Sequence, residues 1–571
     1  MIGSNRTPKY LHLPQSSLIL SDGNVRSIFS NCSEFRLCST PREVIVQTIV
    51  SPTHDQIATA LVARTQSRLE RMTDSELYNY CANAVFQERT RLLQDTRDAT
   101  SHYTKLIDNA AHALRAGRVE KVAAIGQLVE CYAHEIHNRF SQRTYAFATR
   151  FLPGALTRLL TASTQPIQLV STDVDPVSRI VVRGPLDTIR ELAKTHTLIY
   201  APTHLSNLDS PLIGYALHAS RLPPCVYGAG LNLFDNPTMS FFMSRLGAYT
   251  VDRRKRLVLY KDVLKDYSTE LIGRQTHSLF FPGGTRSRSG AIESNLKKGL
   301  LGTAIKAWQE SFDSPETQRD ILVVPITLSF ALVLEAETLI EDSLAEEGKA
   351  RYIISDDEFS EARTVASFSR HVLNLDSSAS ITFGQPLDLI GNPVNDDGVS
   401  LGPRGQPIDR REYITDPYGV IHWDSQRDRV YTQRLTQSLI AAYRRDNVVL
   451  STHLTGLVAW SLLSHAHPHL NRFQLVLIDP QRRWLSYPTM IQGINRARQH
   501  VIRLHKEGEI QWGLPEGDAE AILNDALRRF DDYHQQPVLR RDEDRILVSP
   551  KLTLYYGNRL RGYGLEQEII S

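Results

Sequence analysis

A histidine and an aspartate lie five positions apart in the segment His204-Leu-Ser-Asn-Leu-Asp209. A neutral imidazole can take a proton from an alcohol near pH 7, and a carboxylate on its other ring nitrogen fixes the tautomer and stabilises the imidazolium that forms. The pair therefore predicts a base and its orienting group, acting on a hydroxyl. The spacing alone is weak evidence, because 19 histidines and 63 acidic residues give about one such pair by chance. A second pair, His371 and Asp376, lies in a polar stretch with no strand before it.

A structural alternative stays open for the first pair. Asp209 or Ser210 could cap a helix that begins with Pro211, with His204 an ordinary loop residue. The two roles are compatible, because a helix start holds a carboxylate rigidly, as the orienter of a base requires.

A run of four cations, Arg253 to Arg256, follows the strand-like segment that begins at Gly247. Consecutive cations repel one another unless an anion or solvent screens them, and a solvated charge run is the ordinary interpretation. For Arg253 we favour contact with an anion, because this residue follows the strand directly and can reach the carboxyl edge of a sheet.

A third segment, Phe280 to Gly290, runs from an apolar strand into a Gly283-Gly284 turn and then to Arg286 and Arg288. Backbone N–H groups of such a turn can face an anion, and side chains two positions apart project from one side of an extended segment. Arginine grips phosphate through two parallel hydrogen bonds. The segment therefore suits a phosphate site, and a glycine turn with two surface arginines is the alternative.

The elements around these segments predict an α/β domain. Short apolar runs alternate with helical ones from about Ile180, which favours a mostly parallel sheet with flanking helices and ligands at the carboxyl ends of strands. His204, Arg253 and the Gly283 region each follow a candidate strand. The expected strands are Arg179–Val182, Thr197–Ala201, Cys225–Tyr227, Ala248–Val251, Ser278–Phe281, Ile321–Phe330 and Ser380–Phe383, and the expected helices are Pro211–Ser220, Leu257–Ile272 and Leu296–Ser311.

The flanking sequence divides the chain into further parts. Residues 1–40 are expected to be loosely ordered, 41–170 a helical N-terminal domain, 171–390 the α/β domain, 391–426 a loop or linker, and 427–571 a mostly helical region with a β-like tail at Ile546 to Tyr556. Within the N-terminal domain, Tyr132 to Leu160 predicts one basic amphipathic helix. This helix either packs with a solvated basic face or lies on an anionic membrane.

Composition limits the classes of protein. The 571 residues are 41% hydrophobic and 22% charged, with a net charge of +2, which argues against nucleic-acid binding over the whole surface. Five cysteines without C-x-x-C spacing indicate neither a disulfide framework nor a zinc site, and favour a reducing cytoplasm. We expect no signal peptide and no transmembrane helix, so any contact of the protein with a membrane would be peripheral.

Together the three segments resemble the glycerolipid acyltransferases. His204 to Asp209 matches the H-x4-D block of that family, Gly247 to Arg253 resembles the G-x-x-x-x-x-R block, and Phe281 to Gly290 is similar to F-P-E-G-T-R-S-R-S-G. Val324-Pro325-Ile326 fits a fourth block, Phe383 to Leu387 resembles a late F-G-x-P-L strand, and Tyr555 to Leu565 is similar to the tail of the large glycerol-3-phosphate acyltransferases. One position departs, because Gly283 stands where the family has glutamate.

The resemblance implies an acyltransferase that moves a fatty acyl group from acyl-CoA or acyl carrier protein to the sn-1 hydroxyl of glycerol 3-phosphate. His204 would be the base and Asp209 its orienter. The phosphate would bind Arg253, Arg286 and Arg288, and the loop of Gly283, Gly284 and Thr285 could stabilise the oxyanion. No metal or cofactor is expected beyond the acyl co-substrate, and the acyl-donor pocket is not identified.

Other readings of the resemblance stay open. The acceptor could be 1-acylglycerol 3-phosphate or dihydroxyacetone phosphate, or the chain could be a non-catalytic homologue that binds lipid or acyl carrier. We expect peripheral contact with the cytoplasmic face of a membrane and no nucleic-acid partner.

Overall fold

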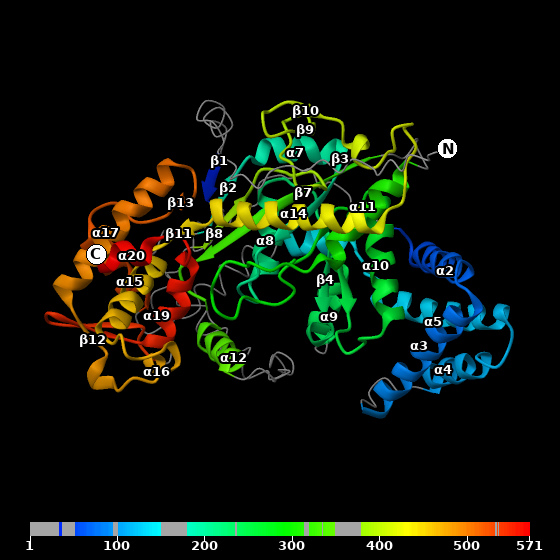
Figure 1. The fold of residues 1–571 in the computed structure, drawn as a ribbon, viewed down its shortest axis with the longest axis horizontal. Helices are drawn as coiled ribbons and strands as arrows, with labels where there is room; N and C mark the ends of the chain where they lie inside the picture. Colours follow the sequence, from blue (N-terminus) through cyan, green and yellow to red (C-terminus); the bar gives the residue numbers. More distant parts are fainter. Residues whose placement is uncertain are drawn as a thin grey trace, which may run out of the picture.

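A computed structural model of the protein describes residues 33–36, 52–94, 101–149, 180–234, 237–312, 319–333, 335–348, 379–530, 534 and 536–571. Its centre is an eight-stranded sheet in the order β1-β2-β8-β7-β3-β6-β4-β5 (Figure 1). β1 runs antiparallel to β2 and β8 antiparallel to β7, and the other pairings are parallel. The predicted mostly parallel sheet is confirmed. The strands are β1 Ser33–Arg36, β2 Ile180–Gly184, β3 His196–Pro202, β4 Val226–Gly230, β5 Ala248–Val251, β6 Ser278–Leu279, β7 Asp320–Phe330 and β8 Ala379–Phe383.

Helices cover both faces of this sheet, as the alternation of side chains along β3 shows. Leu198 and Tyr200 pack in one core with α7 and α8, whereas Ile199 and Ala201 pack in another with α11 and α14. Successive side chains of a strand point to opposite faces, so a strand in this position must be apolar throughout. The helices of this region are α7 Leu186–Thr195, α8 Asp209–Ala219, α9 Pro237–Arg245, α10 Val258–Gly273, α11 Lys298–Ser311, α12 Ala336–Gly348 and α14 Ser425–Arg445.

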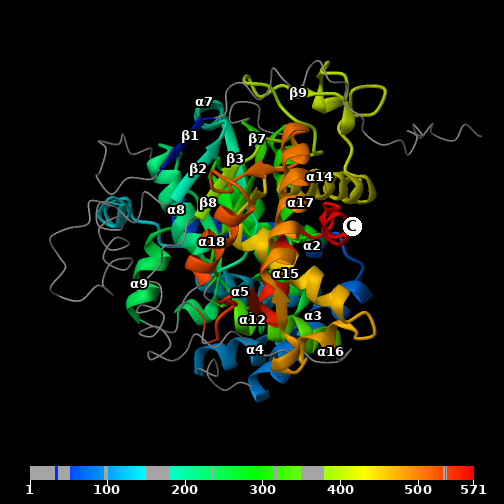
Figure 2. The same cartoon turned by 90° about the vertical axis from the view of Figure 1, so that its left-hand side faces the viewer.

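Helical regions lie at the two ends of the sheet (Figure 1), and the C-terminal one faces the viewer in Figure 2. The N-terminal helices share a core with β4, β5 and α10; they are α2 His54–Glu70, α3 Asp74–Gln94, α4 Ser101–Ala113 and α5 Arg118–Ile136. The C-terminal region surrounds the mostly buried α15. It contains α15 Ser451–Ala466, α16 Arg472–Val476, α17 Tyr487–Lys506, α18 Ala519–Phe530, α19 Pro550–Gly557, α20 Leu565–Ile570, and a small sheet of β12 Trp484–Ser486, β15 Arg545–Val548 and β14 Leu539–Asp542. The expected helical flanking regions are confirmed.

Two expected elements are wrong. The helix predicted over Tyr132 to Leu160 ends at Ile136, and a new helical segment begins only at residue 142. Between them, the N–H groups of Arg139 and Ser141 donate to the carbonyls of Ser244 and Arg245 at the end of α9, which replaces helical hydrogen bonds with long-range ones. The helix breaks because tertiary hydrogen bonds satisfy its backbone.

The tail expected to be β-like is half helical. β15 ends at Val548, and α19 begins with Pro550 at its first turn. Proline suits that position because it lacks the N–H that a first turn leaves unsatisfied. The apolar run after it therefore packs as a helix against α15.

The segment 391–426 has little regular structure, namely β9 Ser400–Leu401, β10 Pro407–Ile408 and a 3-10 turn at Arg410–Tyr413. It is nevertheless attached to the core, since Val394 and Ile414 are fully buried. Of the expected loose N-terminus only Ser33–Arg36 is described, as the edge strand β1, and the pair His371 and Asp376 lies outside the described residues. The domain boundaries stay predictions. In the described part of the chain, no helix is both long and apolar enough to cross a bilayer.

Candidate active site

The three predicted segments meet at one edge of the sheet. β3, β6, β4 and β5 are parallel neighbours, and the segments leave the carboxyl ends of β3, β6 and β5. Parallel strands bring their carboxyl ends to the same edge, where ligands bind in open α/β sheets. His204, the glycine turn and Arg253 are thereby brought together from positions up to about 80 residues apart.

His204 and Asp209 form the expected pair. His204 Nδ1 lies 2.7 Å from Asp209 Oδ2, the imidazole is 19% exposed, and the carboxylate is fully buried. The ring also stacks on Phe281, with centroids 4.1 Å apart. Because Nδ1 is occupied by the carboxylate, Nε2 is the nitrogen left to accept a proton.

Asp209 is held by the turn that precedes it. Its Oδ2 accepts the N–H groups of Leu205 at 2.6 Å and Ser206 at 3.0 Å. The capping alternative is wrong in detail, because α8 begins at Asp209 and its N-cap is Leu208, which makes no side-chain cap hydrogen bond. The Asp209 carboxylate instead accepts N–H groups of the turn that precedes it and pairs with the His204 imidazole.

The glycine turn is bonded to the histidine loop and to Arg253. Ser287 donates its N–H to the carbonyl of His204 at 2.7 Å, and Arg253 Nη2 donates to the carbonyl of Gly284 at 3.2 Å. Gly284 has a φ of +79°, in the left-handed region that favours glycine. Arg253 is exposed, whereas its neighbours Arg254 and Lys255 bond to Asp252 and Glu135. The cation run is thus divided between structural contacts and an Arg253 that faces the site.

The two remaining arginines have different partners. Arg286 pairs with Glu335, with Nη1 3.2 Å from Oε1 and both side chains nearly buried. Glu335 also accepts Ser206 Oγ and the N–H of Asn207, each at 3.0 Å, so Arg286 is joined to the histidine loop. Arg288 points instead to Glu346 of α12, at 2.8 Å. The structure therefore brings Arg286 into the site through Glu335 and ties Arg288 to a neighbouring helix.

Sequence reasoning missed three residues next to the site: Glu293, Glu335 and Arg559. Glu293 accepts the N–H of His204 at 2.6 Å. Arg559, from the C-terminal tail, is buried and donates to Asn447 Oδ1 and to the carbonyl of Leu328. Only the family-like tail at Tyr555 to Leu565 signalled that the end of the chain matters here, and nothing in the spacing of the two glutamates could have found them.

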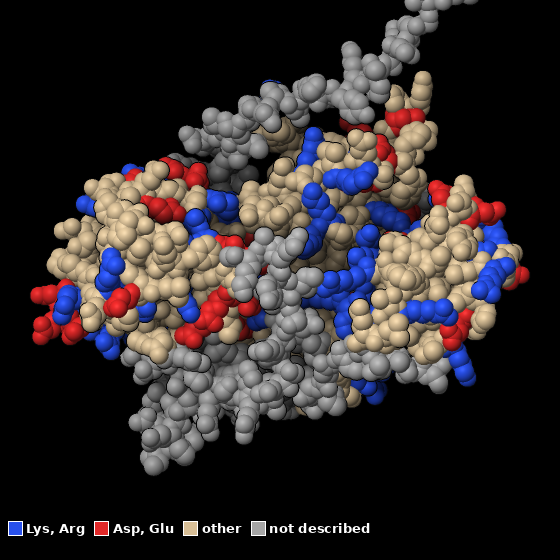
Figure 3. All heavy atoms as spheres, turned by 60° about the horizontal axis from the view of Figure 1, so that its bottom comes forward, with Lys and Arg blue, Asp and Glu red and all other residues tan. Residues whose placement is uncertain are grey.

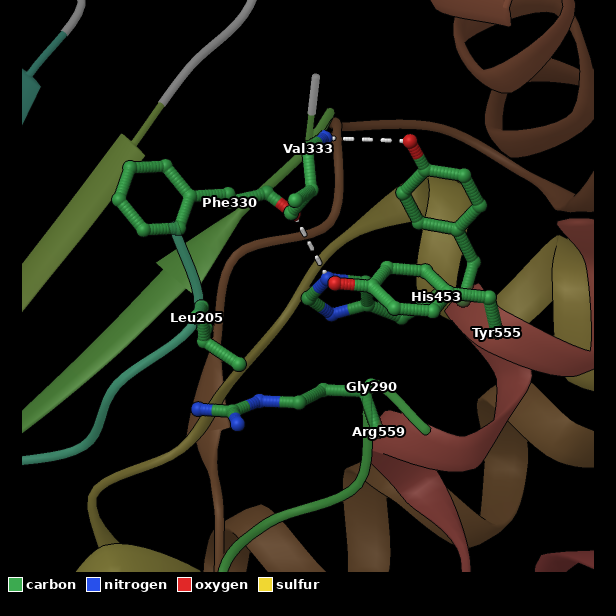
Figure 4. Close-up of a pocket in the computed structure, with 8 residues that line it drawn as sticks. Leu205, Gly290, Phe330, Val333, His453, Tyr555 and Arg559 are labelled. Atoms are coloured by element: carbon green, nitrogen blue, oxygen red, sulfur yellow. Dashed lines mark hydrogen bonds between the residues drawn. The ribbon is translucent and has the colours of Figure 1, made fainter. Parts of the chain in front are cut away.

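A small cavity of about 10 Å³ lies between the site and the C-terminal helices (Figure 4). Within the described residues, three polar atoms on its lining side chains lack hydrogen-bond partners: His453 Nδ1, Tyr555 Oη and Arg559 Nη1. His453 Nε2 bonds to the carbonyl of Phe330, and burial lowers the pKa of His453 to about 3. The cavity has room for about one water molecule and several polar groups to hold it.

The surface view shows lysine and arginine side chains gathered near the middle of one face, between the C-terminal region and the N-terminal helices (Figure 3). A positive field of this kind raises the local concentration of anions. It favours negatively charged ligands on this face of a chain whose net charge is only +2.

Comparisons with known proteins find relatives of the part of the chain that carries this site. Residues 182–329 match the family model named Acyltransferase. The chain is 30% identical over 205 residues to a glycerol-3-phosphate acyltransferase of Haemophilus ducreyi, covering 36% of this chain and 23% of that protein. It is 32% identical over 158 residues to one of Actinobacillus pleuropneumoniae, covering 27% of this chain and 18% of that protein. The resemblance to glycerolipid acyltransferases is confirmed for this segment, which spans less than a quarter of the relatives' length.

A solved structure, the 1-acyl-sn-glycerophosphate acyltransferase PlsC of Thermotoga maritima, is also similar. The match has 16% identity and a TM-score of 0.18, and it covers 43% of this chain and 92% of that one.

Proposed function

We propose that this protein transfers a fatty acyl group from acyl-CoA or acyl carrier protein to the sn-1 hydroxyl of glycerol 3-phosphate, the first step of phospholipid synthesis. The observation that carries the proposal is the bond from His204 Nδ1 to the buried Asp209, which leaves Nε2 to accept a proton in a loop that is hydrogen-bonded to Ser287. The similarity of residues 182–329 to acyltransferases supports the same reaction.

The proposed mechanism is direct acyl transfer. His204 Nε2 removes the proton of the acceptor hydroxyl as its oxygen attacks the thioester carbonyl, and the new C–O bond gives a tetrahedral intermediate. This intermediate then collapses to the ester as the C–S bond breaks. The departing thiolate then takes the proton from His204, so the base is restored. Asp209 stabilises the imidazolium between these steps, and general-base catalysis of this kind typically contributes about 10²- to 10⁴-fold.

Arginines would position the acceptor through its phosphate. Arg253 and Arg286 flank the histidine loop, and Arg288 could join them by leaving the partly exposed Glu346. Fixing the phosphate turns binding into orientation of the hydroxyl. The N–H groups of Gly283, Gly284 and Thr285 are the candidates for stabilising the oxyanion of the tetrahedral intermediate. We propose no metal or further cofactor.

We also propose that the protein meets the cytoplasmic face of a membrane peripherally. Phe147 and Phe241 are 52% and 48% exposed, and Arg245 lies 3.8 Å from the ring centroid of Phe241. Aromatic rings beside arginines suit an anionic lipid surface. In flotation with anionic vesicles, the native protein should float and the double variant F147S/F241S should remain at the bottom. Equal flotation of the two would contradict this contact.

The test of the reaction is a panel of acceptors and thioester donors on the purified protein. Glycerol 3-phosphate is expected to be acylated fastest, and His204→Ala should lower turnover at least about 100-fold while the protein stays folded, as judged by circular dichroism. Preference for 1-acylglycerol 3-phosphate or dihydroxyacetone phosphate would select those acceptors instead. Thioester binding without release would identify a non-catalytic homologue.

A further inference from the structure

Glu293 lies in the loop between the glycine turn and α11, and its carboxyl group is turned inward. Oε1 accepts the backbone N–H of His204 at 2.6 Å. Oε2 is buried and has no hydrogen-bond partner among the described residues. A carboxylate so placed holds the peptide of the histidine itself, 89 positions away in sequence.

The same carboxylate fills the space beside Gly283. A Cβ at position 283 would lie 3.2 Å from Glu293 Cγ, which is tighter than an ordinary contact, and 3.5 Å from Glu293 Oε1, which is an ordinary one. Gly283, unlike Gly284, does not have a left-handed φ, so the backbone itself would accept a side chain there. A side chain at position 283 would therefore press on Glu293, which would have to shift by a few tenths of an ångström to make room for it.

Burial makes this an unfavourable place for a carboxylate. Burial raises the pKa of Glu293, and the His204 N–H and the Arg559 guanidinium act in the opposite direction. A buried acceptor is retained at such cost only where its hydrogen bonds are used. For Glu293, that hydrogen bond is the one accepted from the backbone N–H of His204.

We propose that Glu293 is a positioning residue that fixes the backbone of His204, occupying the space a longer side chain at position 283 would need. This inference rests on the proposed function only for its kinetic readout. Glu293 holds the N–H of His204, Ser287 holds its carbonyl, and Asp209 holds its ring, so peptide and imidazole are fixed independently. The missing glutamate of the third block is thereby replaced from ten positions downstream.

The test compares E293A, E293Q, G283E and the double variant G283E/E293A. E293A should lower kcat by roughly 10- to 100-fold, since a small misplacement of a reacting group has an effect of that size, and should change both KM values less than about twofold. E293Q keeps an acceptor oxygen and should retain most of the activity. G283E alone should be impaired, and the double variant should be more active than either single one. S294A, at the exposed neighbouring residue, is the matched control.

A second readout does not depend on acyl transfer. Amide hydrogen exchange of the peptide containing His204 to Asp209 should be faster in E293A than in the native protein and E293Q, and slow again in the double variant. Unchanged exchange in E293A, or a double variant no better than its worse parent in both readouts, would overturn the proposal. If the native protein transfers no acyl group, the exchange result alone decides on Glu293, and the two failures are distinguished. Should E293A not fold, the comparison of G283E with the double variant decides.

Discussion

At the scale of single residues, His204 is restrained at three points by three separate groups. Asp209 binds the ring, Glu293 the peptide N–H, and Ser287 the carbonyl. A base held in this way loses little orientational freedom when substrate binds, because the cost has been met on folding. The proposed proton transfer therefore depends on loop geometry as much as on the imidazole.

Arg286 is the residue we expect to matter most for the phosphorylated acceptor. R286A should raise KM for glycerol 3-phosphate by about 10-fold or more, since a hydrogen bond to a charged group contributes about 1.5–3 kcal/mol, with a smaller effect on KM for the thioester. R274A, at a partly exposed arginine of an i,i+4 pair with Glu270, is the control. An unchanged KM would remove Arg286 from the phosphate site.

The half-buried His277 and the buried His453 should make stability depend on pH. His277 Nδ1 accepts the N–H of Leu198 at 2.9 Å, and burial lowers the pKa of His277, like that of His453, to about 3. In the unfolded chain both pKa values return to about 6.5. Between about pH 3 and pH 6.5 the unfolded chain binds protons that the folded chain does not. The free energy of unfolding should therefore be highest above about pH 6.5 and decrease as the pH falls below it.

For each histidine the fall should approach about 1.4 kcal/mol per pH unit. Urea unfolding between pH 5 and 7.5 measures it. H277N keeps a hydrogen-bond acceptor and should remove the contribution of one histidine from the slope of unfolding free energy against pH. H469N, at an exposed histidine, should leave this slope unchanged. Equal slopes in H277N and the native protein would show that His277 does not contribute.

At the scale of elements, the end of the arginine loop at Ser289 and Gly290 packs closely against the C-terminal helix α19 and the residue that follows it. Gly290 has a φ of +77°, a Cβ there would lie 2.3 Å from the carbonyl oxygen of Tyr555, and Asn558 Nδ2 donates to the carbonyl of Ser289 at 2.9 Å. The loop that carries Arg286 and Arg288 is thus shaped by a helix more than 250 residues away.

G290A should consequently destabilise the protein by on the order of 1–3 kcal/mol and lower acyl transfer, as measured by thermal unfolding and initial rate. G299A is the matched control, since a Cβ at this helical position meets nothing within 4 Å, and alanine there should stabilise by about 0.5–1 kcal/mol. Similar unfolding temperatures for the two variants would contradict the close approach of loop and helix.

At the scale of the whole molecule, Arg559 joins the C-terminal region to the sheet. It is fully buried, bonds to Asn447 and to the carbonyl of Leu328 in β7, and its charge attracts Glu293 and Asp209. Removing it would leave these carboxylates buried without their cation. The C-terminal region is therefore part of the candidate site as well as a separate helical layer.

R559A should cost on the order of 3–5 kcal/mol, the effect of breaking a buried charge interaction by removing one side, whereas R561A, at an exposed arginine, should cost little. Denaturant unfolding measures both, with acyl transfer followed in parallel. Native-like stability of R559A would show that the tail does not hold the site together.

The local sequence pattern was sufficient to predict much of the secondary structure of this protein. Runs such as Thr197 to Ala201 and Ala248 to Val251 predicted strands because a strand buried on both faces is apolar along its length. His204 and Arg253 were also visible from local pattern, because each comes two residues after the end of a strand and parallel strands end at one edge. The sequence by itself determined most of the sheet, the pairing of His204 with Asp209, and the position of the arginine loops.

Only the tertiary structure decided what holds those groups. The helix expected to run on from Tyr132 stops at Ile136 because its next N–H groups bond to the end of α9. Glu293 and Glu335 bind the histidine loop from 89 and 129 positions away, and Arg559 reaches it from the C-terminal tail. Periodicity reports which side of an element is buried, whereas a buried polar group needs a particular partner, and that partner is set by how distant segments pack.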